Sequence, residues 1–107
     1  MEIHYNDMDP ESPRKSELQD RMTPHALLAL DSPAGPPAWA EAAFEGRRGF
    51  IRTLDDQTNP VVLHDLWMKN SAVEWDVETM KAGHCPFISQ PEELSELCLR
   101  YFKKWTQ

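Results

Sequence analysis

Apolar residues recur at helical spacing over the last part of the chain. A capping box in front of them is formed by Ser89 and Glu92, whose side chains would satisfy each other's backbone donors. Two lysines near Trp105 suit the negative end of a helix dipole. The sequence therefore predicts a core-facing helix, with its apolar stripe at Leu94, Leu97, Cys98, Tyr101, Phe102 and Trp105.

Two other runs have the pattern of strands. Residues 49–54 are rich in strand-forming residues and are bounded by glycine, aspartate and proline turns. Residues 73–78 alternate strictly between apolar and acidic side chains, which suits a strand with one buried face. Between them, Asn59 can cap a helix with Pro60 at its first position. Apolar residues at helical spacing then extend this helix to about Lys69.

The order strand, helix, strand, helix indicates a right-handed parallel crossover unit. Parallel sheets are normally buried on both faces and contain more than two strands, so we infer that further strands belong to this sheet. The alternative is that residues 3–6 supply a third strand and the chain closes as a small α/β domain.

The first 45 residues are patterned differently. Residues 11–22 predict a polar helix with Ser12 as its cap, and only Leu18 and Met22 form an apolar stripe on it. A second short segment, residues 24–30, precedes a proline-rich connector over residues 32–37. We expect this region to lie on a surface or over another domain.

Charge and composition narrow the possible partners. The chain has 107 residues and a formal charge of −7, which disfavours nucleic acid and anionic membranes. Two cysteines do not form a disulfide framework, and neither a secretory signal nor a bilayer-spanning run is evident, so a cytoplasmic location is expected. The four histidines lack zinc-site spacing, and no glycine loop for phosphate is present, so we expect neither metal nor cofactor.

The candidate chemistry lies in the loops that follow the two strands. His84 stands in the loop 82–87 after the second strand, and Asp55 and Asp56 follow the first. The carboxyl ends of adjacent parallel strands meet at one edge of a sheet, so an acid and a base could meet there. A carboxylate would then fix the imidazole tautomer and stabilise its charged form. The alternative is a surface histidine and a turn aspartate.

Residues 49–57 and 82–94 together resemble the carboxyl-terminal portion of an α/β-hydrolase. They are most similar to the small esterase and hydroxynitrile-lyase-like branch, especially its fungal members, in which the loop typically reads Gly-His-Ser-Pro-Phe before a Pro-Glu-Glu-Leu helix start. The segments 5–7 and 24–39 resemble the end of that branch's lid. The resemblance implies a partial α/β-hydrolase fold with two domains or segments, a lid-like helical and Pro-rich region over 1–45 and a β-α-β-α unit over 46–107.

By this resemblance, His84 is the base of a Ser-Asp-His triad and Asp56 is its acid, with Asp55 as the alternative acid. Trp67 and Phe87 either line an acyl pocket or belong to the core. Cys85 stands where the family usually has serine, and a reactive thiol there is not favoured, because nothing in the sequence would lower its pKa. Many relatives in the branch belong to fungal specialised metabolism.

The family's nucleophile is missing from these residues. It would stand on a Gly-x-Ser-x-Gly elbow ahead of the acid and the base, and no such motif occurs in the 107 residues. We therefore expect no hydrolysis by this chain alone. Three interpretations stay open: part of a hydrolase, half of a split enzyme completed by another chain, or a small acidic binding module. A small ester-like substrate is expected only for the completed site.

Overall fold

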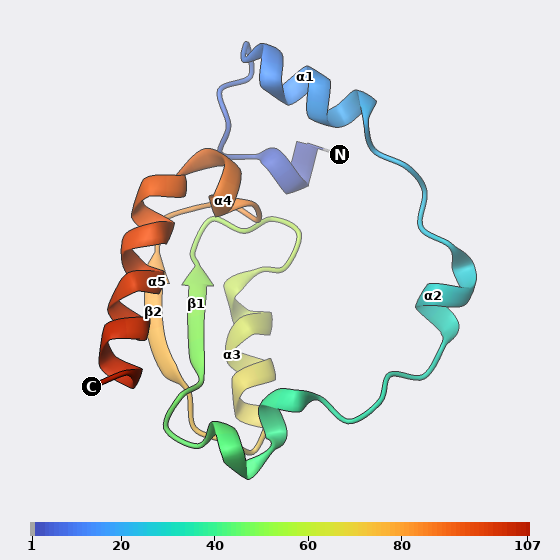
Figure 1. Cartoon of the computed structure of the whole chain (residues 1–107). Helices are drawn as coiled ribbons and strands as arrows, with labels where there is room; N and C mark the ends of the chain where they lie inside the picture. The colour runs from blue at the N-terminus through green and yellow to red at the C-terminus, as the bar shows by residue number, and fades with distance from the viewer. Residues whose placement is uncertain (1) are drawn as a thin grey trace.

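The computed structural model describes residues 2–107, with side chains from His4 onward. Its centre is a parallel pair of strands, β1 (Gly49–Thr53) and β2 (Asp76–Met80), in which Gly49 pairs with Asp76 and Thr53 with Met80. Helix α3 (Val61–Asn70) connects the strands, and α5 (Pro91–Trp105) follows β2 after the short helix α4 (Pro86–Ser89) (Figure 1). The predicted order and the parallel direction are confirmed. Within the described residues the sheet has these two strands.

The two long helices cover opposite faces of the strand pair. Phe50 contacts the ring of His64 on α3, whereas Ile51 packs against Leu97 and Met80 in the core beneath α5. Successive side chains of a strand point to opposite faces, so α3 and α5 lie on different sides. The result is a small three-layer α/β unit.

Gly49 allows α5 to approach β1 closely. A Cβ atom at this position would lie 3.0 Å from a ring carbon of Tyr101 and 3.1 Å from one of Trp105. The Tyr101 hydroxyl donates to the carbonyl oxygen of Asp76 at 2.7 Å. The predicted core-facing helix is confirmed by Leu97 and Tyr101, which are its buried residues. Phe102, which was placed in the same apolar stripe, is 59% exposed, so that part of the prediction is wrong.

Of the three predicted helix caps, Ser12 does precede α1, although its side chain forms no capping hydrogen bond, and the other two are wrong. The residue before α5 is Gln90, because the helical turn of α4 takes in Ser89, whose hydroxyl donates to Asp7 instead. The residue before α3 is Pro60, and the backbone N–H of Asn59 donates to Asp56. The Ser89 hydroxyl is thus used by a residue that is distant in sequence, and Asn59 lies in the turn that surrounds the Asp56 carboxylate.

The second strand begins later than the alternation predicts. Residues 73–75 connect α3 to β2, and Trp75 packs against Trp39 and Phe50 while its ring N–H donates to Ser71. Met80 is the buried side chain of β2, whereas Val77 is 47% exposed. Val77 pairs with Phe50 and therefore shares its face of the sheet, but α3 packs on β1 rather than on β2.

The first 45 residues form short elements around this unit. They are η1 (Glu2–Tyr5), α1 (Pro13–Asp20), α2 (Leu27–Asp31), η2 (Ala38–Ala40) and η3 (Ala42–Phe44). Helices α1 and α2 follow an arc that leads away from the strands and returns at η2 (Figure 1). Residues 2–5 are a 3₁₀ helix, so the alternative in which residues 3–6 add a third strand is wrong. No described helix is long and apolar enough to cross a membrane.

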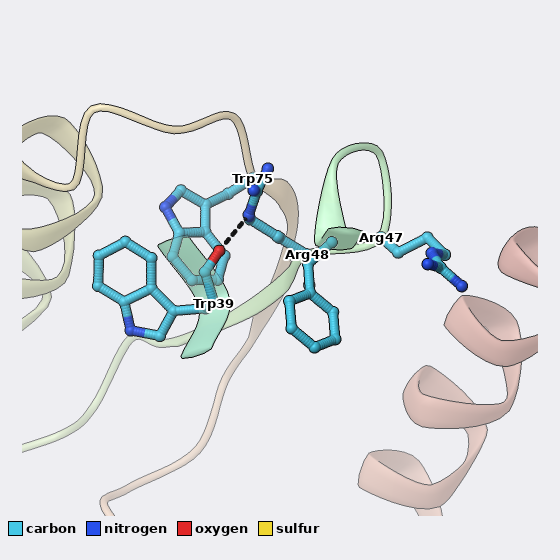
Figure 2. Close-up of a pocket in the computed structure, with 6 residues that line it drawn as sticks. Trp39, Arg47, Arg48 and Trp75 are labelled. Carbon is cyan, nitrogen blue, oxygen red and sulfur yellow. Dashed lines mark hydrogen bonds between the residues drawn. The ribbon is translucent and has the colours of Figure 1, made fainter. Parts of the chain in front are cut away.

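Arg48 fastens the end of this arc to the start of β1. Its guanidinium is buried and donates to the carbonyl oxygens of Trp39 at 2.5 Å and Glu41 at 2.9 Å. Figure 2 shows Arg48 turned toward the Trp39 carbonyl and Arg47 extending away from it. A shallow pocket of about 260 Å³ lies here, between Trp39 and Trp75. Because backbone carbonyls engage Arg48, its role is to anchor the segment.

Candidate functional site

The structure brings Asp56 and His84 together at the carboxyl ends of the strands. Nδ1 of His84 lies 3.0 Å from Oδ2 of Asp56 and 3.2 Å from Oδ1. Asp56 is buried, whereas Asp55 is exposed and its backbone N–H donates to the carbonyl of Ala82. Of the two candidate carboxylates, Asp56 is therefore the one that contacts the histidine.

The Asp56 carboxylate is held by several donors. Oδ1 accepts hydrogen bonds from the backbone N–H groups of Thr58 at 2.9 Å and Asn59 at 2.8 Å, and the Thr53 hydroxyl donates to Oδ2 at 3.3 Å. Burial acts to raise the pKa of Asp56, but the N–H of Asn59, the interaction with His84 and the N–H of Thr58 together bring it below its usual value of 3.8. Asp56 is therefore ionised at neutral pH.

This geometry selects one form of the imidazole. A carboxylate can only accept a hydrogen bond, so Nδ1 of His84 carries the proton that it donates to Asp56. In the neutral ring, Nε2 is then the nitrogen with a free lone pair. The His84 side chain is 28% exposed. Asp56 therefore orients the ring through Nδ1, while part of the ring stays accessible to solvent. Such a histidine can accept a proton and keep the resulting charge beside a carboxylate.

A second histidine, His64 on α3, also approaches the carboxylate. Its Nε2 lies 3.6 Å from Oδ2 of Asp56, and its ring is buried between Phe50 and Trp67. Sequence reasoning considered His64 only as a metal ligand. One signal could have indicated this role. His64 lies on the face of α3 that packs against β1, and the same face lies next to the loop that carries Asp56.

Residues near the amino terminus cover the same loops. The ring of His4 meets that of His84 edge-on, with centroids 5.2 Å apart. Asn6 and Asp7 line a pocket of about 460 Å³ together with Leu54 and the Asp55–Gln57 turn. The sequence linked residues 5–7 to a lid but did not predict these contacts.

The remaining candidate residues contribute less. Burial raises the pKa of the Cys85 thiol, and the charges of Asp7 and Asp56 raise it further, so a thiolate nucleophile is disfavoured. Trp67 and Phe87 are 46% and 61% exposed, so the interpretation of both as core residues is wrong. Among the residues that the structure describes, no group of three histidine, cysteine or acidic side chains could hold a metal ion.

Comparison with known proteins gives one informative match. No family model and no solved structure matches the chain. A curated protein of Arabidopsis thaliana named "Putative methylesterase 14, chloroplastic" is 27% identical over 100 residues, which cover 83% of this chain. The chain spans only 29% of that relative's length. This chain is thus an α/β unit with a distant similarity to part of a protein named as a methylesterase.

Proposed function

We propose that this chain supplies the acid and the base of an ester-hydrolysing site of the α/β-hydrolase type. The observation that carries the proposal is the 3.0 Å contact between Nδ1 of His84 and the buried carboxylate of Asp56. In this proposal His84 is the general base and Asp56 is the acid that orients it. The distant methylesterase-named relative supports a small carboxylic ester as the substrate class.

The proposed reaction needs a hydroxyl nucleophile. Nε2 of His84 takes the proton of that hydroxyl as its oxygen bonds to the ester carbonyl carbon. The imidazolium, stabilised by Asp56, then returns the proton to the departing alcohol as the acyl bond breaks. Water repeats the sequence to release the acid and to restore the hydroxyl. Because these 107 residues hold no Gly-x-Ser-x-Gly elbow, we propose that the nucleophile and the oxyanion donors come from a separate segment or polypeptide.

One edge of β1 has no strand beside it among the described residues, and this edge supports such a completion. Backbone groups of Arg48 and Leu54 bond to β2, and peptide groups along a strand alternate in direction, so those of Gly49, Ile51 and Thr53 point away from β2. A further parallel strand would pair with them. Parallel sheets that are covered on both faces normally contain more than two strands.

Expression of any longer reading frame that includes this chain tests the proposal. The coding sequence upstream of Met1 is examined for an in-frame Gly-x-Ser-x-Gly segment, and the longer polypeptide is assayed with a chromogenic short-chain ester. We expect turnover that falls by several orders of magnitude in His84→Ala, as for loss of a triad member, while Asp55→Asn stays near wild type. Turnover that survives His84→Ala would contradict the proposal, whereas the absence of an elbow upstream would exclude a segment of the same polypeptide as the source of the nucleophile.

An acidic binding module is the second candidate. It is favoured by α2, whose Leu27, Leu28 and Leu30 are exposed, a pattern that suits contact with another protein. A module of this kind would fold cooperatively by itself, so a calorimetric melt separates it from the hydrolase proposal.

A further inference from the structure

Two adjacent side chains near the amino terminus connect two loops. We call residues 54–59, which include Asp56, the acid loop, and residues 82–87, which include His84, the base loop. The Nδ2 group of Asn6 donates to the carbonyl oxygen of Asp55 at 2.8 Å, on the acid loop. Oδ2 of Asp7 accepts from the backbone N–H of Gly83 at 2.7 Å, on the base loop, and from the Ser89 hydroxyl at 2.6 Å, at the end of α4. The dipeptide Asn6–Asp7 therefore forms hydrogen bonds with the loop that carries Asp56 and with the loop that carries His84.

The dipeptide is packed against Gly83 without free space. A Cβ atom on Gly83 would lie 2.6 Å from Oδ1 of Asn6 and 2.6 Å from Oδ1 of Asp7. Both of these oxygens are buried and have no hydrogen-bond partner among the described residues. A buried oxygen without a hydrogen-bond partner destabilises the folded state. The hydrogen bonds of Asp7 Oδ2 and of Asn6 Nδ2 must therefore offset this cost and keep the dipeptide against Gly83.

Other hydrogen bonds hold the base loop on either side of Gly83. After Gly83, the carbonyl oxygen of Cys85 accepts from the backbone N–H groups of Ile88 and Ser89. The backbone N–H of Asp55 bonds to Ala82, and the Gln90 side chain bonds to Lys81. Both of these hydrogen bonds hold residues that precede Gly83 in the chain. At Gly83 itself, immediately before the histidine, the acceptor is the Asp7 carboxylate.

We propose that Asn6 and Asp7 are positioning residues that fix the acid loop and the base loop at the separation in which His84 reaches Asp56. Their catalytic meaning rests on the proposed function, since they act through His84 and touch no reacting atom. The segment that resembles the end of a lid is then a structural part of the acid–base pair. Displacing this segment would loosen the contact between His84 and Asp56.

Matched substitutions at Asp7 test the proposal by NMR without any ester. Asp7→Leu removes the acceptor at similar size, whereas Asp7→Asn keeps one carbonyl oxygen that can occupy the position of Oδ2. Two signals are followed: hydrogen exchange of the Gly83 amide, and the downfield Nδ1 proton of His84. The amide of Leu54, which donates to Met80 in the strand pair, reports the fold itself. All variants are measured with the same stabilising osmolyte.

We expect Asp7→Leu to speed exchange at Gly83 at least about tenfold relative to Leu54, as for loss of a hydrogen bond to a charged group. The Nδ1 proton of His84 should broaden or vanish in Asp7→Leu and persist in Asp7→Asn. Equal protection of Gly83 and an unchanged Nδ1 signal in Asp7→Leu would overturn the proposal. An unprotected Leu54 amide in wild type would overturn it as well, because the fold that places Asp7 would then be absent.

These results are independent of turnover. If the Nδ1 signal depends on Asp7 but the longer polypeptide hydrolyses no ester, the positioning role stands and the proposed reaction fails. If esters are hydrolysed but the Nδ1 signal ignores Asp7, only the positioning role fails.

Discussion

At the scale of single residues, burial distinguishes two adjacent carboxylates that look equivalent in the sequence. Asp55 and Asp56 both follow β1, yet Asp56 turns inward to the N–H groups of Thr58 and Asn59 and to His84. Asp55 stays exposed. The loop conformation therefore defines which carboxylate can work with the histidine.

The lowered pKa of Asp56 predicts how stability depends on pH. A carboxyl group whose pKa is lower in the folded state stabilises that state above its unfolded value of 3.8, and this contribution is lost as the pH falls through the folded pKa. The free energy of unfolding of wild type should therefore exceed that of Asp56→Asn at about pH 6 and approach it at about pH 3. Urea unfolding followed by tryptophan fluorescence measures both values.

Asp55→Asn is the control for this comparison, since its exposed carboxylate should leave the pH dependence unchanged. A gap between wild type and Asp56→Asn that grows as the pH falls would show that the sign is wrong.

Two glycines give a matched test of the crowding around the base loop. In Gly83→Ala the new methyl group would meet Asn6 and Asp7 at 2.6 Å, whereas in Gly35→Ala it would meet nothing within 4 Å. We expect Gly83→Ala to cost about 1–3 kcal/mol, as overpacking does. Gly35→Ala should cost nothing or stabilise slightly. Urea titration measures the free energy of unfolding of both variants. Equal changes in this free energy for Gly83→Ala and Gly35→Ala would contradict the prediction.

At the scale of elements, α5 is the part whose sequence pattern and packing agree best. Its amphipathic stripe puts Leu97 against Met80 and Ala82, where it is 3% exposed. Patterns that depend on one hydrogen bond, such as the expected cap at Ser89, were less informative. The Ser89 hydroxyl donates to Asp7, which lies in a distant segment of the chain, instead of capping α5. Periodic burial over fifteen residues is harder to override than a single capping bond.

Leu97 and Leu99 provide the corresponding test on α5. Leu97→Ala should cost about 2–5 kcal/mol, because it opens a cavity in a small core. Leu99 is 55% exposed, and Leu99→Ala should change stability by less than about 0.5 kcal/mol. Circular dichroism during urea titration measures both. A larger effect of Leu99→Ala would mean that α5 is rotated from its described orientation.

At the scale of the whole molecule, the chain is more extended than its length requires. Its radius of gyration is 16.0 Å, whereas a compact domain of this length has about 13 Å. The fully buried hydrophobic cluster consists of Met80, Ala82 and Leu97. The arc through α1 and α2 has no buried residue. These features fit a chain whose sheet is completed by other strands.

This shape predicts a weak thermal transition for the chain alone. A fully packed domain of similar length unfolds with an enthalpy of about 0.7 kcal/mol per residue, and we expect scanning calorimetry to give a much smaller value and a broad transition. A sharp transition with the full enthalpy would instead favour the self-contained binding module.

The sequence by itself determined the strand–helix–strand–helix order, the parallel direction and the apolar face of α5, because these follow from periodic burial and connection length. It also limited the candidate acid to two adjacent residues and indicated His84 as the candidate base. Only the tertiary structure decided that Asp56 faces the histidine, that His64 approaches the same carboxylate, and that Asn6 and Asp7 hold both loops. Apart from the approach of His64, these contacts join residues 28 to 76 positions apart. They depend on loop conformation, which local pattern and propensity do not encode.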